Sequence, residues 1–156
     1  MSYRSSLFAA ALVAGVVVCS VAPAVAGGDW NDKGVAWKPY EDGLKEAQQE
    51  KKPIGLIFYT EWCPHCANYS GVFHDSKVVE QSKRFVMIRL DRDKNKELSK
   101  KYAPDGDYIP RTYFLSSSGT LDPELHAPRD QFKYFYDERD PGSILKGMDA
   151  ALTKLK

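Results

Sequence analysis

The chain has 156 residues, of which 43% are apolar and 28% are charged. This is the composition of one folded domain of ordinary size, not of a disordered or fibrous chain. Its 22 Lys and Arg residues are balanced by 21 Asp and Glu residues, so no strong electric field is present to attract nucleic acid or an anionic membrane.

The amino-terminal segment has the layout of a secretory signal peptide. Arg4 provides a cationic start, an almost unbroken apolar run follows from Leu7 to Val21, and the small-residue stretch Ala24-Val25-Ala26 ends it. We therefore predict cleavage after Ala26 and a mature domain of residues 27–156. A membrane anchor is the alternative interpretation, but the run is shorter than the ~20 residues of a comfortable span and stops at Pro23.

The remaining chain alternates segments of helical and strand pattern. Helical spacing of apolar residues predicts helices at Tyr40–Lys52, at Pro64 to about Arg84 with a break near Ser70 and Gly71, at Lys94–Tyr102 and at Ser143–Leu155. Apolar runs predict strands at Gly34–Trp37, Ile54–Tyr59, Phe85–Leu90, Arg111–Leu115 and Phe132–Tyr136. This order predicts an α/β domain with a central mixed β-sheet flanked by helices.

The number and spacing of the cysteines indicate a reactive pair rather than structural disulfides. Cys19 lies inside the apolar run, and a lipid anchor there would require small residues before it, where valines stand. The other two, Cys63 and Cys66, are spaced C-x-x-C. A structural framework of disulfides would need more cysteines spread along the chain. A bridge across two residues also closes too small a loop to stabilise the fold by much, so we expect this pair to be reactive.

The segment Trp62-Cys63-Pro64-His65-Cys66 directly follows the predicted strand Ile54–Tyr59. It resembles the active site of the thioredoxin superfamily, in which Trp-Cys-x-x-Cys begins the helix after the central strand. Two further stretches are similar to the small endoplasmic-reticulum thioredoxin-like proteins of the anterior-gradient group and their bacterial relatives: Pro104-Asp105-Gly106-Asp107-Tyr108-Ile109-Pro110-Arg111 and Lys133-Tyr134-Phe135-Tyr136. The resemblance covers about Trp37 to the C-terminus and implies a thioredoxin-like fold.

The resemblance also implies roles for the cysteines. At the first position of a helix, Cys63 would meet free backbone N–H groups and the positive end of the helix dipole, which favour the reactive thiolate. Pro64 suits this first turn because it lacks an N–H. Cys63 would attack, and the less accessible Cys66 would resolve. A protonated His65 would add positive charge beside the thiolate, and Cys-Pro-His-Cys is the sequence that DsbA-type oxidants carry.

Other positions follow the family pattern in part. Pro110 matches the cis-proline that faces the sulfurs, which implies a cis bond after Ile109 and a free backbone edge there for a substrate strand. Trp62 is expected to pack and to contact substrate. Many members carry a buried acid six residues before the first cysteine, where this chain has Ile57. Glu61, expected on the exposed rim, is a weak substitute, so proton transfer would rely on water.

Several residues have ordinary structural interpretations. Arg111 is expected either to contact substrate or to pair with a nearby acid. His74 and His126 are expected at the surface, and the charged run from Arg92 to Glu97 is expected to be a solvated helix start. The aromatic residues at 134–136 are expected in the core and at its rim.

These observations predict an exported oxidoreductase that exchanges disulfides with protein thiols through Cys63 and Cys66, with the oxidising direction favoured. The alternatives are a periplasmic disulfide reductase or isomerase, a copper- or zinc-handling protein that uses both thiolates and His65, and a non-catalytic binding module that uses the edge at Ile109. Closed structural zinc needs four ligands, and no second Cys or His pair stands at ligand spacing.

The expected partners are proteins with thiols or disulfides and a redox partner that recycles the site. No cofactor is expected beyond the Cys63–Cys66 disulfide, and neither nucleic acid nor, after cleavage, a membrane is an expected partner. The C-terminal residues Leu152-Thr153-Lys154-Leu155-Lys156 carry no KDEL-like retention signal. We therefore expect secretion, or export by a bacterium into an oxidising periplasm.

Overall fold

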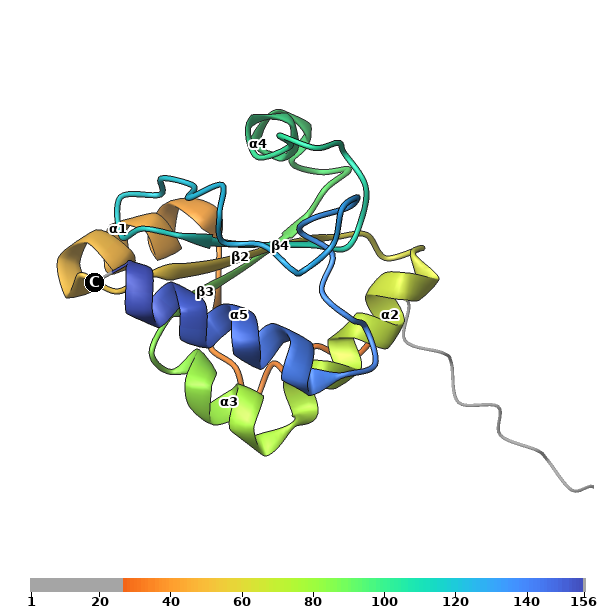
Figure 1. Ribbon diagram of the computed structural model, residues 1–156, viewed down its shortest axis with the longest axis horizontal. Coiled ribbons are helices and arrows are strands. Elements are labelled where there is room, and N and C mark those ends of the chain that lie inside the picture. Colours follow the sequence, from red (N-terminus) through yellow and green to blue (C-terminus); the bar gives the residue numbers. More distant parts are fainter. Residues whose placement is uncertain (1–26, 156) are drawn as a thin grey trace, which may run out of the picture.

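The computed structural model describes residues 27–155, which form a four-stranded mixed sheet with helices on both faces (Figure 1). The strands are β1 (Trp37–Lys38), β2 (Ile54–Tyr59), β3 (Val86–Asp91) and β4 (Arg111–Leu115), in the order β1-β3-β2-β4. β1 and β2 run parallel to β3, and β4 runs antiparallel to β2. The predicted α/β class with a central mixed sheet is confirmed. The predicted signal peptide lies outside the described residues.

The helices are α1 (Tyr40–Glu50), α2 (Pro64–Ser70), α3 (Ser76–Ser82), α4 (Lys96–Lys101) and α5 (Pro141–Lys154), and a 3₁₀ turn, η1 (Gly71–His74), joins α2 to α3. Figure 1 shows α2, α3 and α5 on one side of the sheet and α1 and α4 on the other. The predicted helical region after Pro64 is therefore confirmed, including its break near Ser70.

The alternating side chains of each strand fill two apolar cores, one on each face of the sheet. Ile57 of β2 and Phe114 of β4 belong to the core under α2, α3 and α5. Their neighbours Leu56 and Tyr113 belong to the core under α1. Because both faces are covered, β2 is buried from Ile54 to Phe58, which explains its apolar run without alternation.

Capping residues decide where the helices begin. The carboxylate of Asp140 accepts the N–H of Gly142 at 2.8 Å, so α5 starts at Pro141 rather than at the predicted Ser143. After β3, the carboxylate of Asp91 accepts the N–H of Asp93 at 2.8 Å and holds a turn. The helix predicted from Lys94 therefore begins only at Lys96.

The predicted strand Phe132–Tyr136 is wrong. Phe132 has a φ of 52°, a backbone conformation outside the β region. The N–H of Phe135 donates to the carbonyl of Phe132 at 2.9 Å, and the segment meets β4 where the N–H of Thr112 donates to the carbonyl of Tyr134 at 2.8 Å. Tyr134 and Tyr136 are both buried, but they lie in different cores. Aromatic alternation therefore identified buried side chains and not a strand.

The edge strand is also displaced, because β1 comprises Trp37 and Lys38 rather than residues 34–37.

Candidate active site

The cysteine pair lies where β2 ends and α2 begins. Cys63 is the N-cap of α2, and Pro64 is the first residue of the helix. The sulfur of Cys63 accepts the backbone N–H of Cys66 at 3.2 Å. One of the free N–H groups of the helix terminus is thus directed at this sulfur, and such groups favour a negative charge there.

The two thiols differ in access. Both cysteines are free. Cys63 retains 4% of its surface exposed, whereas Cys66 has none. A substrate sulfur can therefore approach this pair only at Cys63, and Cys66 can act only on a sulfur already attached to Cys63.

Cys66 is held in the thiol form. Burial raises the pKa of the Cys66 thiol, and its hydrogen bond with Cys63 raises it further. A backbone hydrogen bond with Thr60 and the positive charge of Arg92 act in the opposite direction. The balance favours a neutral thiol, so Cys66 has to lose a proton before it can attack.

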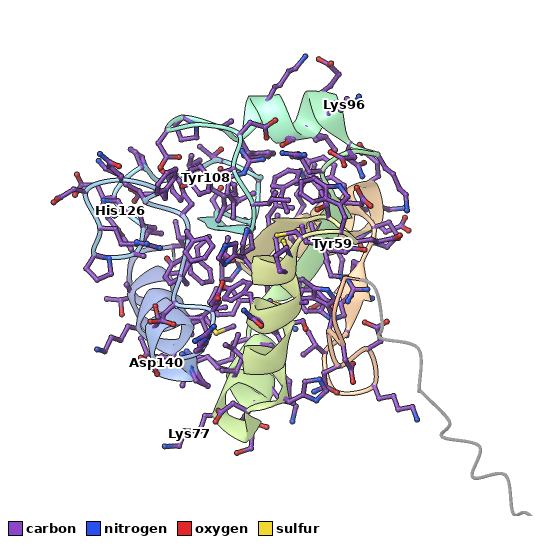
Figure 2. All side chains as sticks on the ribbon, turned by 90° about the vertical axis from the view of Figure 1, so that its right-hand side faces the viewer. Tyr59, Lys77, Lys96, Tyr108, His126 and Asp140 are labelled. Carbon is purple, nitrogen blue, oxygen red and sulfur yellow. The ribbon has the colours of Figure 1, made fainter. Side chains whose placement is uncertain are left out.

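The loop that carries the proline packs on the same apolar core as the cysteines. The peptide bond between Ile109 and Pro110 is cis, as predicted. Ile109 packs against the apolar cluster that contains Cys63 and Cys66. The hydroxyl groups of Tyr69 on α2 and Thr112 on β4 lie 2.8 Å apart and join the two elements. Figure 2 views the molecule from the α2 side, with Tyr59 and Tyr108 on opposite sides of the strand ends.

His65 contacts an acid that the sequence did not reveal. Its Nδ1 lies 2.7 Å from Oε2 of Glu138, a residue 73 positions further along the chain in the loop before α5. The imidazole also packs edge-on against Phe135, with ring centroids 6.0 Å apart. No motif or periodicity connects these residues, so only the folded chain shows their contact.

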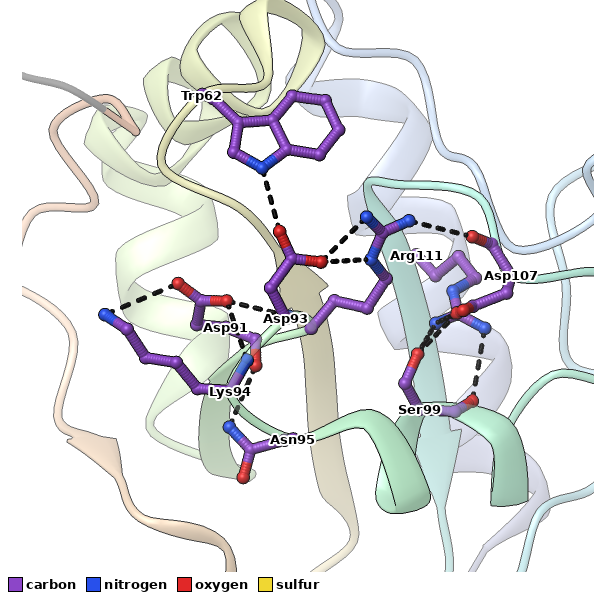
Figure 3. A network of polar contacts seen from close by, with 9 residues as sticks. Trp62, Asp91, Asp93, Lys94, Asn95, Ser99, Asp107 and Arg111 are labelled. Atoms are coloured by element: carbon purple, nitrogen blue, oxygen red, sulfur yellow. Dashed lines mark hydrogen bonds and ion pairs between the residues drawn. The ribbon is translucent and has the colours of Figure 1, made fainter.

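Trp62 is exposed over 65% of its surface, yet its indole is anchored. Its Nε1–H donates to Asp93 at 2.8 Å, and Arg92 donates to the other carboxylate oxygen of Asp93 at 2.8 and 3.0 Å (Figure 3). The hydrogen bond from Trp62, together with Arg92, lowers the pKa of Asp93. The charged run is therefore not only a solvated surface, because it fixes the tryptophan beside Cys63.

Arg111 is a buried structural cation, which settles the choice that the sequence left open. The residue has no exposed surface. Its guanidinium donates to Asp107 at 2.7 Å and to the hydroxyl and the carbonyl of Ser99 (Figure 3). It also donates to the carbonyls of Tyr102 and Gly106, at 3.3 and 3.1 Å. Since the guanidinium is fully buried and its hydrogen bonds are with residues 99–107, it shapes the loop before Pro110 rather than the molecular surface.

The position of the family's buried acid is apolar here. Ile57 is fully buried, while Glu61 is exposed and accepts a hydrogen bond from Lys94 at 3.2 Å. The hydroxyl of Thr60 is buried and has no hydrogen-bond partner within residues 27–155. Thr60 is thus a polar residue next to Cys66 that sequence reasoning missed.

The remaining histidines lie apart from the cysteines. His74 is exposed, with Nε2 2.9 Å from the carbonyl of Asp29, and His126 is half-buried, with Nδ1 2.7 Å from the carbonyl of Ala127. In the described part of the chain, no three His, Cys, Asp or Glu side chains are grouped so that they could hold a metal ion. No helix there combines the length and apolar character needed to cross a bilayer.

Comparisons with known proteins agree with this geometry. A family model described as thioredoxin-like matches residues 36–117. The human anterior gradient protein 2 homolog is 28% identical over 128 residues, which cover 81% of this chain and 71% of that protein. Human anterior gradient protein 3 is 29% identical over 126 residues, covering 79% and 74%.

Two solved structures share the fold. A thioredoxin from Thermus thermophilus superposes with a TM-score of 0.58 at 22% identity, covering 78% of this chain and 89% of that one. A structure described as DsbH oxidoreductase has a TM-score of 0.57 at 21% identity, covering 90% and 96%. The resemblance inferred from the Trp62–Cys66 segment and its thioredoxin-like fold are confirmed.

Proposed function

Because the chain belongs to the thioredoxin-like family, we propose that it is a thiol-disulfide oxidoreductase that exchanges disulfides with protein thiols through Cys63 and Cys66. One observation carries the proposal. Cys63 keeps 4% of its surface exposed at the amino end of α2, and its sulfur accepts the N–H of Cys66, a residue with no exposed surface. This is the asymmetry that an attacking and a resolving cysteine require.

In the oxidising direction, a substrate thiolate attacks the Cys63 sulfur of the Cys63–Cys66 disulfide. The S–S bond breaks, and Cys66 leaves with the electron pair and takes up a proton. A second substrate thiolate then attacks the substrate sulfur of the mixed disulfide and releases Cys63. The substrate loses two electrons and gains a disulfide, and the cysteine pair is reduced. A partner disulfide must then reoxidise the pair.

Several features support the oxidising direction. The N–H of Cys66 stabilises a thiolate at Cys63, and a positive charge on His65 acts in the same sense where Glu138 does not offset it. A stabilised thiolate favours the reduced form of the pair, which makes its disulfide a stronger oxidant. Trp62, Ile109 and Pro110 are the proposed substrate contacts, while Pro64 and Glu61 modulate the site.

The oxidised protein is expected to speed disulfide formation in a reduced, unfolded model protein. Its equilibrium with glutathione should give a potential above the about −270 mV of thioredoxin. A potential at or below that value, with rapid reduction of insulin, would instead indicate a reductase. Metal retained by the purified protein at a constant ratio would favour metal handling. If no thiol-disulfide exchange were detected, the non-catalytic binding module would be the remaining interpretation.

The raised pKa of Cys66 predicts a pH-dependent resolving step. When Cys63 carries glutathione, the attack of Cys66 that releases it should accelerate about tenfold per pH unit between about pH 6 and pH 8, since the thiolate fraction rises tenfold per unit below the pKa. Quenched-flow mass spectrometry measures the release, with a Cys66→Ala protein as the blank. A rate that levels off below pH 7 would contradict this prediction.

We also propose that the protein is exported and that residues 1–26 are removed on the way. An oxidising compartment would let the Cys63–Cys66 disulfide persist. The partners proposed for it there are proteins with thiols or disulfides and a separate thiol-disulfide protein that recycles the pair.

A further inference from the structure

The imidazole of His65 is held by the segment before α5. Its Nδ1 lies 2.7 Å from Oε2 of Glu138, and its ring stands nearly perpendicular to that of Phe135, at an interplanar angle of 81°. The hydrogen bond to the sulfur of Cys63 comes from the N–H of Cys66. Both of these contacts of the ring are with residues 135–138, and among the described residues no hydrogen bond joins the ring to the Cys63 sulfur.

Glu138 is itself fixed in place. Its Oε1 accepts the side-chain N–H of Asn68 at 2.9 Å, and Asn68 lies one turn of α2 beyond His65. The side chain of Glu138 is only 13% exposed, against 63% for that of His65. The Nε of the exposed Arg139 lies 3.8 Å from Oε1 of Glu138, the oxygen that also accepts the Asn68 N–H. A carboxylate that bridges two residues of the reactive helix is a defined acceptor, unlike a freely solvated surface acid.

We infer that Glu138 is a positioning residue that fixes the imidazole of His65 against residues 135–138 and offsets its positive charge. This inference rests on the proposed function. Its consequence is a weaker oxidant than a Cys-Pro-His-Cys site with an unrestrained histidine.

The direction of this effect does not depend on pH. Glu138 contacts the imidazole directly, Arg139 approaches Glu138, and the guanidinium of Arg129 packs on the Phe135 ring at 4.9 Å. Replacing Glu138 by glutamine removes one negative charge. Without the carboxylate, the imidazole can lose at most part of its single positive charge, which is less than the one negative charge removed. The net charge around Cys63 therefore becomes more positive at every pH at which the Glu138 carboxylate is ionised. A more positive surrounding favours the thiolate.

The test is Glu138→Gln, which keeps the volume and the acceptor for Asn68. The equilibrium constant for reduction of the Cys63–Cys66 disulfide by glutathione should rise about threefold, the size typical of exposed ion-pair interactions. This corresponds to a potential about 14 mV more oxidising, at 29.6 mV per tenfold. The matched control is Asp137→Asn, one residue away, whose carboxylate accepts the N–H of Arg139 at 2.9 Å. That variant should match the wild type.

A double-mutant cycle distinguishes an effect of Glu138 that acts through His65 from a direct effect of the Glu138 charge on Cys63. The effect of Glu138→Gln should shrink when His65→Gln is also present, because no imidazole remains to be released toward Cys63. An equal effect in both backgrounds would overturn the positioning role. So would a Glu138→Gln protein that matches the wild type.

A second measurement keeps this inference separate from the proposed function. In a Cys66→Ala protein, the rate at which iodoacetamide alkylates Cys63 below about pH 6 reports the thiolate without any disulfide exchange. Glu138→Gln should raise this rate about threefold, and Asp137→Asn should not. A protein that fails to equilibrate with glutathione would refute the proposed function, whereas an unchanged alkylation rate would refute the role of Glu138.

Discussion

Replacing Cys63 by serine is expected to reduce thiol-disulfide exchange to the uncatalysed rate while leaving the fold intact. A hydroxyl cannot form the mixed disulfide, and Cys66 has no exposed surface with which to replace it. Serine is a good N-cap and can accept the N–H of Cys66, so stability should change by no more than about 1 kcal/mol. The measurements are the oxidation rate of a reduced model protein and the unfolding midpoint.

Cys66→Ser is the matched control for this experiment. It leaves Cys63 able to attack but removes the resolving thiol, so mixed disulfides with glutathione or substrate should accumulate and be visible by mass spectrometry. Full exchange activity in Cys63→Ser, or trapping by that variant instead of by Cys66→Ser, would reverse the assigned roles.

Replacing Arg111 by methionine is expected to destabilise the protein by about 3–5 kcal/mol, because several buried acceptors lose their donor at a cost of about 1–3 kcal/mol each. The guanidinium packs 5.0 Å from the ring of Phe58 and donates to the carbonyls of Ser99, Tyr102 and Gly106. Methionine fills much of the same volume but leaves these buried acceptors without a donor. Urea unfolding followed by circular dichroism measures the loss.

Two companion variants locate the cause of that loss. Asp107→Asn should destabilise the protein by about 1–3 kcal/mol, less than Arg111→Met, because the buried guanidinium loses its counter-charge while an asparagine oxygen can still accept its N–H. Arg84→Met, at an exposed position, should stay within about 0.5 kcal/mol of the wild type. If Arg111→Met fell within that range too, the buried network would be contributing nothing to stability.

Elements that depend on neighbouring residues could be predicted from the sequence. The apolar runs Ile54–Tyr59 and Arg111–Leu115 are β2 and β4, with the predicted bounds. The glycine at 71 marks the change from α2 to η1. The position of Cys63 at the start of α2 also follows from local features, since Pro64 directly follows it and cannot lie deep in a helix.

Elements that depend on side-chain hydrogen bonds or on chain closure were predicted less well. The aromatic pattern at 132–136 correctly indicated the burial of Tyr134 and Tyr136, but Phe132 is 50% exposed and has a positive φ. An alternating pattern contains no information on backbone direction. The start of α5 was misplaced because the cap at Asp140 lies before the apolar stripe.

The sequence by itself determined the strands β2 and β4, the start of α2 after Cys63 and the cysteine pair proposed to react, because each depends on residues within a few positions of one another. Only the tertiary structure decided what surrounds that pair. Glu138 meets His65 across 73 positions, and Asp93 meets Trp62 across 31. Such contacts require the closure of long loops, whose entropic cost is met by the packing of the whole core and not by any local pattern.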